Sequence, residues 1–376
     1  EEFGLPIDPS LRVADLPVGM KQRVEILKAL YRDVNILILD EPTAALTPQE
    51  SEELFHNLRS LRASCKSVVF ITHRLPEVME LADRVSVMRR GEMVATLCVA
   101  DTSIEELSSL MIGGEELKSL APDAHECGKA ILEIENLFVY GSNSLCGVSF
   151  CLNQGEILGV AGVSGNGQLE LVEALIGQRP IEIGRVLLAG EDISCRDVRW
   201  RREHGIVYIP EDRMTKGLNL EASLTENAIA AAYYKAPLSK RGLLRTKAIR
   251  VRVAQLVDAF GVQGGEEGAI ATLSGGNLQK VVLGRELEGN PRVIVAFQPT
   301  RGLDVKSIHF VHSLLFEARQ REAAVLLVSY DLDEILALSD RVLVMYHGCI
   351  AGEMDRGEVS ESKLGYLMAG GQVGGD

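Results

Sequence analysis

The residues with the clearest chemical meaning are glycines in the segment GVSGNGQL at positions 162–169. Glycines let backbone N–H groups converge on phosphate oxygens where a Cβ would intrude, and a helix behind such a loop adds its dipole. The usual GxxxxGK[ST] pattern would place lysine at Gln168 and a magnesium-binding hydroxyl at Leu169, and this chain has neither. By itself the segment fits either a phosphate loop or a structural turn. The candidate nucleotide-binding residues are Gly162, Gly165, Asn166, Gly167 and Gln168.

A second group of chemically capable residues occurs twice, 257 positions apart. LPVGMKQR at 16–23 recurs as LSGGNLQK at 273–280, and ILDEPT at 38–43 recurs as VAFQPT at 295–300. The offset holds without insertion or deletion over some 75 residues. A constant offset of this length indicates a duplicated domain.

The two copies differ in what precedes them. The second begins near Ile131 and includes the glycine segment, whereas the first has only 15 residues ahead of its repeat. Subtracting the offset from Ile131 leads us to expect an N-terminally truncated chain, in which about 126 residues of the first domain, with its phosphate loop, are missing.

Regular elements must position these residues. Apolar runs at 34–39 and 67–71 predict buried parallel strands, and helical spacing predicts a helix over 48–63 between them. The second copy repeats this order with 293–296, 305–320 and 324–328. Each copy is therefore expected to be a three-layer α/β domain. The remaining strand prediction is an antiparallel region over 131–157 leading into a strand at 157–160.

The predicted domain boundaries follow from breaks in these patterns. Residues 1–100 would be the C-terminal part of the first domain, and 101–130, with Gly113, Gly114, Pro122 and an acidic run, would be a linker. Residues 131–369 would be the complete second domain, and 370–376 a flexible tail.

Composition narrows the function classes. A length of 376 residues, with 46% apolar and 24% charged, is typical of globular domains. The net charge of −14 argues against sequence-independent binding of nucleic acid. The seven cysteines form no CxxC pair, which favours reduced thiols in a cytosolic compartment over a zinc site or disulfide framework.

The order of these motifs resembles that of ATP-binding cassette (ABC) ATPases over nearly the whole chain. The resemblance implies two nucleotide-binding domains of the P-loop NTPase fold, the first incomplete and the second carrying an antiparallel β subdomain and a helical subdomain. It also implies that ATP and Mg²⁺ are the cofactors. In that family the LSGG signature reaches the γ-phosphate of ATP held by the partner domain, which here assigns Ser274, Gly275 and Gly276.

The resemblance assigns catalytic roles to the first copy. Asp40 would hold the Mg²⁺ shell through water, and Glu41 would orient or deprotonate the attacking water. His73 matches the histidine that contacts the γ-phosphate. The corresponding residues of the second copy are Phe297, Gln298 and Tyr330, none of which can act as a carboxylate ligand or general base. Tyr140 is either a platform for adenine or a core tyrosine.

The LSGG signature segments also differ between the copies, and here it is the second copy that is intact. The second copy has an intact LSGG and Asp304, whereas the first has LPVG at 16–19 and Thr47. Because domains of this family pair head to tail, Asp40 and Glu41 would share one competent site with the second-copy signature. The glycine segment at 162–169 would face the degraded signature of the first copy, LPVG at 16–19.

Among ABC proteins the chain resembles the ATPase subunits of bacterial importers of ribose, galactosides and nucleosides, closest to the nucleoside type. Glu211, in IPEDR at 209–213, occupies the region that couples the nucleotide site to the membrane subunit. The resemblance implies two integral-membrane permease subunits, an extracytoplasmic solute-binding lipoprotein and a peripheral position at the cytoplasmic face of the inner or plasma membrane. The chain as given is expected not to hydrolyse ATP alone. The alternatives are a soluble tandem cassette acting on ribosomes or nucleic acid, and an inactive remnant.

Overall fold

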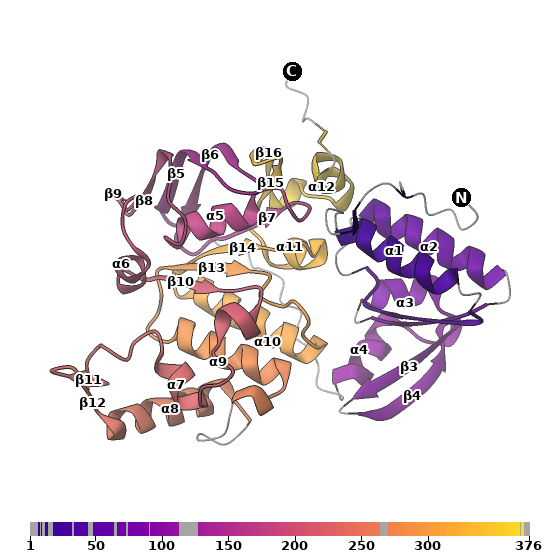
Figure 1. Ribbon diagram of the computed structural model, residues 1–376, viewed down its shortest axis with the longest axis horizontal. Helices are drawn as coiled ribbons and strands as arrows, with labels where there is room; N and C mark the ends of the chain where they lie inside the picture. The colour runs from indigo at the N-terminus through magenta and orange to yellow at the C-terminus, as the bar shows by residue number, and fades with distance from the viewer. Residues whose placement is uncertain are drawn as a thin grey trace. The chain divides into compact units, whose positions relative to one another are not determined.

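The computed structural model describes residues 7, 9, 12–13, 18–31, 34–43, 48–63, 66–72, 74–89, 91–112, 127–263, 270–368 and 370–371. The chain divides into two compact units, Glu1–Lys118 and Ser119–Asp376 (Figure 1). Within the described ranges, every helix is too short or too polar to cross a membrane.

The second unit is built on a six-stranded sheet. Its order is β10 (Ile206–Ile209), β13 (Val293–Phe297), β14 (Ala324–Val328), β7 (Ile157–Ala161), β15 (Arg341–Tyr346) and β16 (Cys349–Asp355). The first five strands are parallel, and β16 runs antiparallel to β15. Every residue of β7, β13 and β14 is buried, as the continuous apolar runs predict for strands covered on both faces.

An antiparallel sheet and one helix cover one face of this central sheet. The sheet has the order β6 (Leu145–Asn153), β5 (Ala130–Val139), β8 (Ile183–Leu188) and β9 (Glu191–Asp192). Together with α5 (Gln168–Leu175), it packs onto the inward-facing residues of β13 and β14 in one apolar cluster. The antiparallel region predicted from residue 131 onward is therefore present.

Three helices cover the opposite face: α10 (Val305–Gln320), α11 (Leu332–Leu338) and α12 (Glu361–Met368). Leu315, Ile335 and Leu364 pack there against Ile294 and Leu327 of the sheet, all fully buried. The unit thus has the expected three layers, with β7 and its following loop near the middle of the sheet (Figure 1).

A helical region completes the second unit. It contains α7 (Leu224–Ile229), α8 (Thr246–Phe260) and α9 (Gly275–Leu287), whose apolar sides share a separate cluster. It is reached from β10 through a turn at Arg213–Gly217. The short helix α6 (Val198–Glu203) precedes β10, and a small hairpin of β11 (Ser239–Lys240) and β12 (Leu243–Leu244) lies between α7 and α8.

The first unit contains fewer layers. Its elements are α1 (Val18–Leu30), β1 (Ile36–Asp40), α2 (Pro48–Ala63), β2 (Ser67–Ile71), α3 (Leu75–Leu81), β3 (Arg84–Arg89), β4 (Glu92–Cys98) and α4 (Ile104–Ile112). β1 and β2 pair in parallel, and β3 and β4 pair antiparallel. One apolar cluster joins α1, β1 and α2, and another joins α3, β3 and α4.

The elements of the first unit recur in the second at the sequence offset of 257. Each helix and strand from α1 to β4 has a counterpart with matching bounds: α9, β13, α10, β14, α11, β15 and β16. Their contacts recur as well. The Thr43 hydroxyl donates to Glu77 Oε1 at 2.5 Å, and the Thr300 hydroxyl donates to Glu334 Oε1 at 2.8 Å. A register shift after Val87 is matched by one after Val344.

One face of the first unit's sheet is uncovered. Ile36, Ile38, Val69 and Ile71 are 51–66% exposed, although the sequence predicted buried strands. Their counterparts in β13 and β14 are fully buried beneath the antiparallel sheet and α5. The prediction of buried strands is wrong for this face because no described segment of the first unit covers it.

Residues 101–130 differ in part from the predicted linker. Ile104–Ile112 form α4, in which Leu107 is fully buried against α3 and β3. Helix α4 therefore belongs to the first unit. Of the predicted tail, Gly370 and Gly371 donate backbone hydrogen bonds to Leu367 and Tyr366, and 372–376 lie outside the described residues.

Candidate functional site

The glycine segment forms the connection between β7 and α5. Gly167 directly precedes α5 with a φ of 99°, a left-handed conformation that favours glycine. A Cβ at Gly167 would also lie 2.8 Å from the Leu145 side chain. Gly162 and Gly165 have positive φ too. The segment therefore has the strand–loop–helix arrangement of a phosphate-binding loop.

The Gln168 side chain is buried against the backbone of the glycine segment. It is 1% exposed, and Oε1 accepts a hydrogen bond from the Asn166 N–H at 3.2 Å. Nε2 donates to the Val163 carbonyl at 3.2 Å. One of the backbone donors expected to bind phosphate is thus already bonded within the protein, and no lysine charge replaces it.

Asn166 is held from outside the loop. Its Oδ1 accepts from the His347 N–H at 2.9 Å, and its carbonyl accepts from the Gly348 N–H at 3.0 Å. The turn between β15 and β16 therefore fixes the glycine segment. Asn166 is 8% exposed, so its role in this structure is to position the loop.

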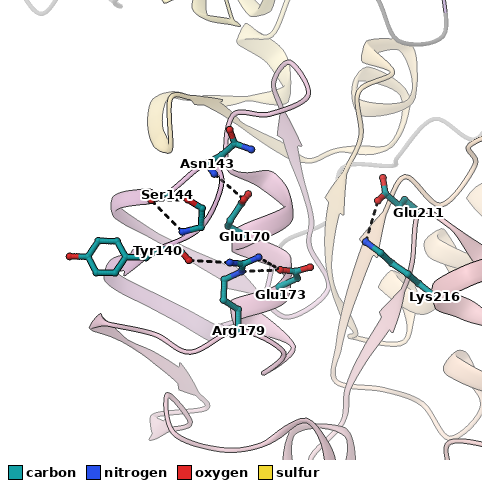
Figure 2. Close-up of polar contacts among 9 residues, drawn as sticks. Tyr140, Asn143, Ser144, Glu170, Glu173, Arg179, Glu211 and Lys216 are labelled. Carbon is teal, nitrogen blue, oxygen red and sulfur yellow. Dashed lines mark hydrogen bonds and ion pairs between the residues drawn. The ribbon is translucent and has the colours of Figure 1, made fainter. Parts of the chain in front are cut away.

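Tyr140 lies at the end of β5 beside the glycine segment. Its side chain is 65% exposed and points outward in Figure 2, so the alternative of a core tyrosine is wrong. Its carbonyl accepts from Arg179 Nη1 at 3.0 Å, and Arg179 also pairs with Glu173 at 2.6 Å. These contacts fix the backbone at Tyr140 and leave its ring available for stacking on a base.

Glu170 is a buried carboxylate that the sequence analysis did not single out. It is 2% exposed, and Oε1 accepts from the Asn143 N–H at 3.1 Å (Figure 2). Oε2 is buried without a hydrogen-bond partner. Glu170 is the acidic residue in the first turn of α5, directly behind the loop. The only signal in the sequence is its position two residues after Gln168.

Phe297, Gln298 and Tyr330 lie at the carboxyl ends of β13 and β14. The Phe297 and Tyr330 rings meet edge to face with centroids 6.1 Å apart. The Tyr330 hydroxyl hydrogen-bonds Ser164 of the glycine segment, and burial raises the pKa of Tyr330. Tyr330 thus contacts the glycine segment, and an aromatic pair and an amide occupy the positions that match Asp40, His73 and Glu41.

Gln298 has an unusual backbone and a free donor. Its φ is 50°, and its N–H donates to the Val328 carbonyl at 2.8 Å. Its side chain is 8% exposed, and Nε2 has no hydrogen-bond partner. An amide donor of this kind suits a phosphate oxygen or water but cannot remove a proton.

The signature segment begins α9. Ser274 is the N-cap, and its Oγ accepts from the Asn277 N–H at 3.4 Å and from Asn277 Nδ2 at 3.1 Å. Gly275 and Gly276 are the first two residues of the helix. A Cβ at Gly276 would lie 2.5 Å from Ser307 Oγ, so this position requires glycine for packing.

Arg213 joins the signature region to the loop after Pro-Thr. Nη1 donates to the Arg301 carbonyl at 2.8 Å, and Nη2 donates to the Gly302 carbonyl at 3.2 Å. Asp304 ends this loop as the N-cap of α10, accepting from the Ser307 N–H at 2.7 Å. Burial lowers the pKa of Arg213. Its bridging contacts could not be read from the sequence, where it was only a neighbour of Glu211.

Glu211 pairs with one residue of the turn at Arg213–Gly217 and with one residue of the loop after Pro-Thr. Its carboxylate pairs with Lys216 at 3.4 Å, as Figure 2 shows, and with Arg301 at 3.5 Å. Lys216 also lines a cavity of about 430 Å³ between α6, the turn at Arg213–Gly217 and α7. Glu211 therefore connects the Pro-Thr loop to a surface cavity.

The first unit positions Asp40 and Glu41 at the end of β1. Asp40 is exposed, and Glu41 has a φ of 48° with its N–H donating to the Ile71 carbonyl at 2.8 Å. This is the backbone arrangement of Gln298. His73 and Thr47 lie outside the described residues, as do residues 16 and 17 of the first signature. The pairing of these residues with Ser274 and Asp304, which belong to the other unit, stays a prediction.

The central parallel sheet, with a glycine loop between β7 and α5, defines a nucleotide-binding α/β cassette. Residues 2–44 and 145–301 match the family model described as ABC transporter. The chain belongs to the ABC transporter family, and it is a transport ATPase of that family.

Related proteins and structures agree with this assignment. The chain is 41% identical to the nucleoside import ATP-binding protein NupA of Lactococcus lactis, over 99% of this chain and 74% of NupA. It is 44% identical to the guanosine import ATP-binding protein NupO of Bacillus subtilis, over 98% of this chain and 73% of NupO. A crystal structure of a nucleotide-free ATP-binding cassette from an ABC transporter aligns with a TM-score of 0.53 at 25% identity, over 62% of this chain and 94% of that structure.

Proposed function

We propose that this chain is the ATP-binding subunit of an importer for nucleosides or simple sugars. The observation that carries the proposal is the identity of 41% and 44% to two proteins named for import of nucleosides and of guanosine. A ribose import ATP-binding protein of Rhizobium meliloti is 40% identical over 97% of this chain, which keeps simple sugars within the proposal.

The chain carries two unequal nucleotide sites in this proposal. Asp40 and Glu41 would serve one site with His73 and with the signature and Asp304 of the second unit, paired head to tail. An exposed aspartate at the carboxyl edge of a parallel sheet fits a water-mediated ligand of Mg²⁺, a cation that prefers oxygen donors. Bound there, Mg²⁺ would neutralise phosphate charge. Glu41 would orient or deprotonate water.

The second site would bind nucleotide without hydrolysing it. The residues beside its loop do not fit Mg²⁺, because Phe297 supplies no oxygen and the Gln168 amide oxygen already accepts the Asn166 N–H. Tyr140 would stack on the base, and Gln298 Nε2 would donate to a phosphate oxygen. The proposed asymmetry rests on the repeated backbone and the differing side chains of Glu41 and Gln298.

The uncovered sheet face of the first unit supports a further part of the proposal. Ile36, Ile38, Val69 and Ile71 match positions that 131–209 cover in the second unit. We propose that an equivalent segment, carrying a lysine-containing phosphate loop, covers this face in the working ATPase. The two cassettes would then be tandem copies of one fold.

The cavity near Lys216 is the proposed contact with a permease subunit. Arg199, Arg202 and Lys216 line it with Tyr233, whose side chain is 51% exposed. Glu286, which also lines it, is 2% exposed and pairs with Arg202. The lining residues are net basic, although Arg199 also pairs with Glu203 and Lys216 with Glu211, and this lining suits an acidic cytoplasmic segment of an integral-membrane subunit. Such contacts would hold the chain at the cytoplasmic face of the membrane.

Hydrolysis by the purified chain tests the catalytic part of the proposal. Because its one glycine loop lacks lysine, the 376-residue chain should release no phosphate from ATP above background. Glu41→Gln is the matched variant, since it removes only the proposed base. Steady hydrolysis by the chain that Glu41→Gln abolishes would contradict this part of the proposal.

Affinity purification from membranes tests the importer part. The tagged chain should recover two integral-membrane subunits. The complex should dissociate when a residue that lines the cavity, such as Arg199, is substituted. Sedimentation of the chain with ribosomes instead would favour the soluble tandem cassette. The two outcomes are distinguishable in one preparation.

A further inference from the structure

Two exposed cysteines, 203 positions apart in the sequence, lie side by side in the second unit. Cys146 is the second residue of β6, and Cys349 is the first residue of β16. The Cys146 N–H donates to the Gly348 carbonyl at 2.9 Å, and Cys349 Sγ lies 3.4 Å from the Cys146 carbonyl oxygen. These contacts bring the two residues close together, as a disulfide requires.

The Cys349 thiol lies near Cys146. Burial raises the pKa of the Cys349 thiol, and the neighbouring Cys146 raises it further. A raised pKa leaves less thiolate on Cys349. Because the Cys349 thiol also donates to the Cys146 carbonyl at 3.4 Å, Cys349 is the thiol that reacts second.

The pair adjoins the contact that positions the glycine segment. Gly348, next to Cys349, donates its N–H to the Asn166 carbonyl at 3.0 Å. Leu145, next to Cys146, packs close to Gly167. A covalent bond between the two cysteines would link β6 to β16. It would thereby hold together Leu145 and Gly348, which contact Gly167 and Asn166 of the glycine segment.

We propose that Cys146 and Cys349 form a reversible disulfide when the protein meets a low-molecular-weight disulfide. The Cys146 thiolate attacks one sulfur of oxidised glutathione, and a glutathione thiolate leaves. The Cys349 thiolate then attacks Cys146 Sγ in the mixed disulfide and releases the second glutathione. Two protein thiols lose two electrons and two protons, and one glutathione disulfide becomes two glutathione thiols. The bond locks the β15–β16 turn onto β6 beside the nucleotide loop.

Peptide mapping after oxidation tests the proposal. The purified full chain is equilibrated with oxidised glutathione, blocked at free thiols and digested with trypsin without reductant. Trypsin does not cleave between Arg179 and Pro180, so tryptic peptide 130–185 carries both Cys146 and Cys151, and peptide 342–356 carries Cys349. Cys151→Ser is therefore the matched control for Cys146→Ser, because both lie on β6 and on the same peptide.

The expected product is a link between these two peptides, two hydrogen atoms lighter than their sum. Cys151→Ser should keep the link, and Cys146→Ser and Cys349→Ser should each lose it. The oxidised chain should melt roughly 5 °C higher than the reduced chain and return on reduction. Glutathione adducts on Cys146 or Cys349 without the link, or a link that survives Cys146→Ser, would overturn the proposal.

Discussion

At the scale of single residues, the repeat supplies matched pairs that differ mainly in burial. Arg319 pairs with Asp340 at 2.6 Å, and these side chains are 4% and 16% exposed. Their counterparts, Arg62 and Asp83, pair at 2.7 Å with side chains 61% and 65% exposed. The chemistry and spacing are the same, so the difference in environment decides how much each pair stabilises its unit.

Asp340→Ala should therefore be far more costly than Asp83→Ala. The first change leaves the Arg319 charge buried and removes the acceptor of the Ile157 N–H, for a loss of about 3–5 kcal/mol. The second should cost less than about 1 kcal/mol. Urea unfolding of both variants measures the difference. Equal losses would mean that burial does not govern these pairs.

The buried Gln168 allows a test of the glycine segment. Gln168→Lys restores the lysine of the phosphate-loop pattern and adds a charge-assisted hydrogen bond, so ATP should bind about tenfold more tightly. A fluorescent ATP analogue measures the affinity. Gln178→Lys adds the same charge at an exposed position ten residues later and should leave affinity unchanged. A gain of the same size in both variants would assign the effect to net charge alone.

At the scale of elements, the two copies of the parallel strands differ in what covers them. Leu326 is fully buried in β14, whereas its counterpart in β2, Val69, is 51% exposed. The apolar face of β1 and β2 is thus a surface of the first unit, and the same face of β13 and β14 is core.

Alanine substitutions should reveal this difference. Leu326→Ala should lower the free energy of unfolding by about 2–5 kcal/mol, because it opens a cavity. Val69→Ala should change it by less than about 0.5 kcal/mol, because the side chain is only half covered. Denaturant unfolding followed separately in each unit by hydrogen exchange provides the measurement. A large loss for Val69→Ala would show that the face is covered in solution.

The sequence predicted the regular elements well where local signals suffice. The helix bounds 48–63 and 305–320 match α2 and α10, since apolar spacing marks their lengths and Asp304 caps the second. The exposure of β1 and β2 could not be predicted, because a buried strand and an uncovered one have the same apolar run. Helix α4 was missed within the predicted linker for the opposite reason: nearby acidic and glycine residues obscured its short apolar spacing.

The candidate site was predictable in its positions and not in its contacts. Spacing from the repeat identified Gln298 and Tyr330 as the counterparts of Glu41 and His73. It could not show that Gln168 hydrogen-bonds to the loop backbone, that Glu170 is buried with a free oxygen, or that Arg213 bridges two segments. Those facts depend on side chains that meet only after folding.

At the scale of the whole molecule, the proposed importer assembly depends on the basic cavity. Arg199→Glu reverses one charge of its lining and should reduce recovery of the membrane subunits at least tenfold, as expected for like charges at an interface. ATP binding should be unchanged. Arg185→Glu makes the same reversal on β8, outside the cavity, and should leave recovery unaffected. Equal recovery with Arg199→Glu would place the membrane contact elsewhere.

The left-handed backbone shared by Glu41 and Gln298 has a broader consequence. Both residues have φ near 50°, and both donate an N–H to the neighbouring strand. A glutamate and a glutamine are nearly isosteric. The repeat therefore places two side chains of almost the same shape, one acidic and one neutral, at equivalent positions of the two units. The two positions therefore present a carboxylate and an amide from the same backbone conformation within one chain.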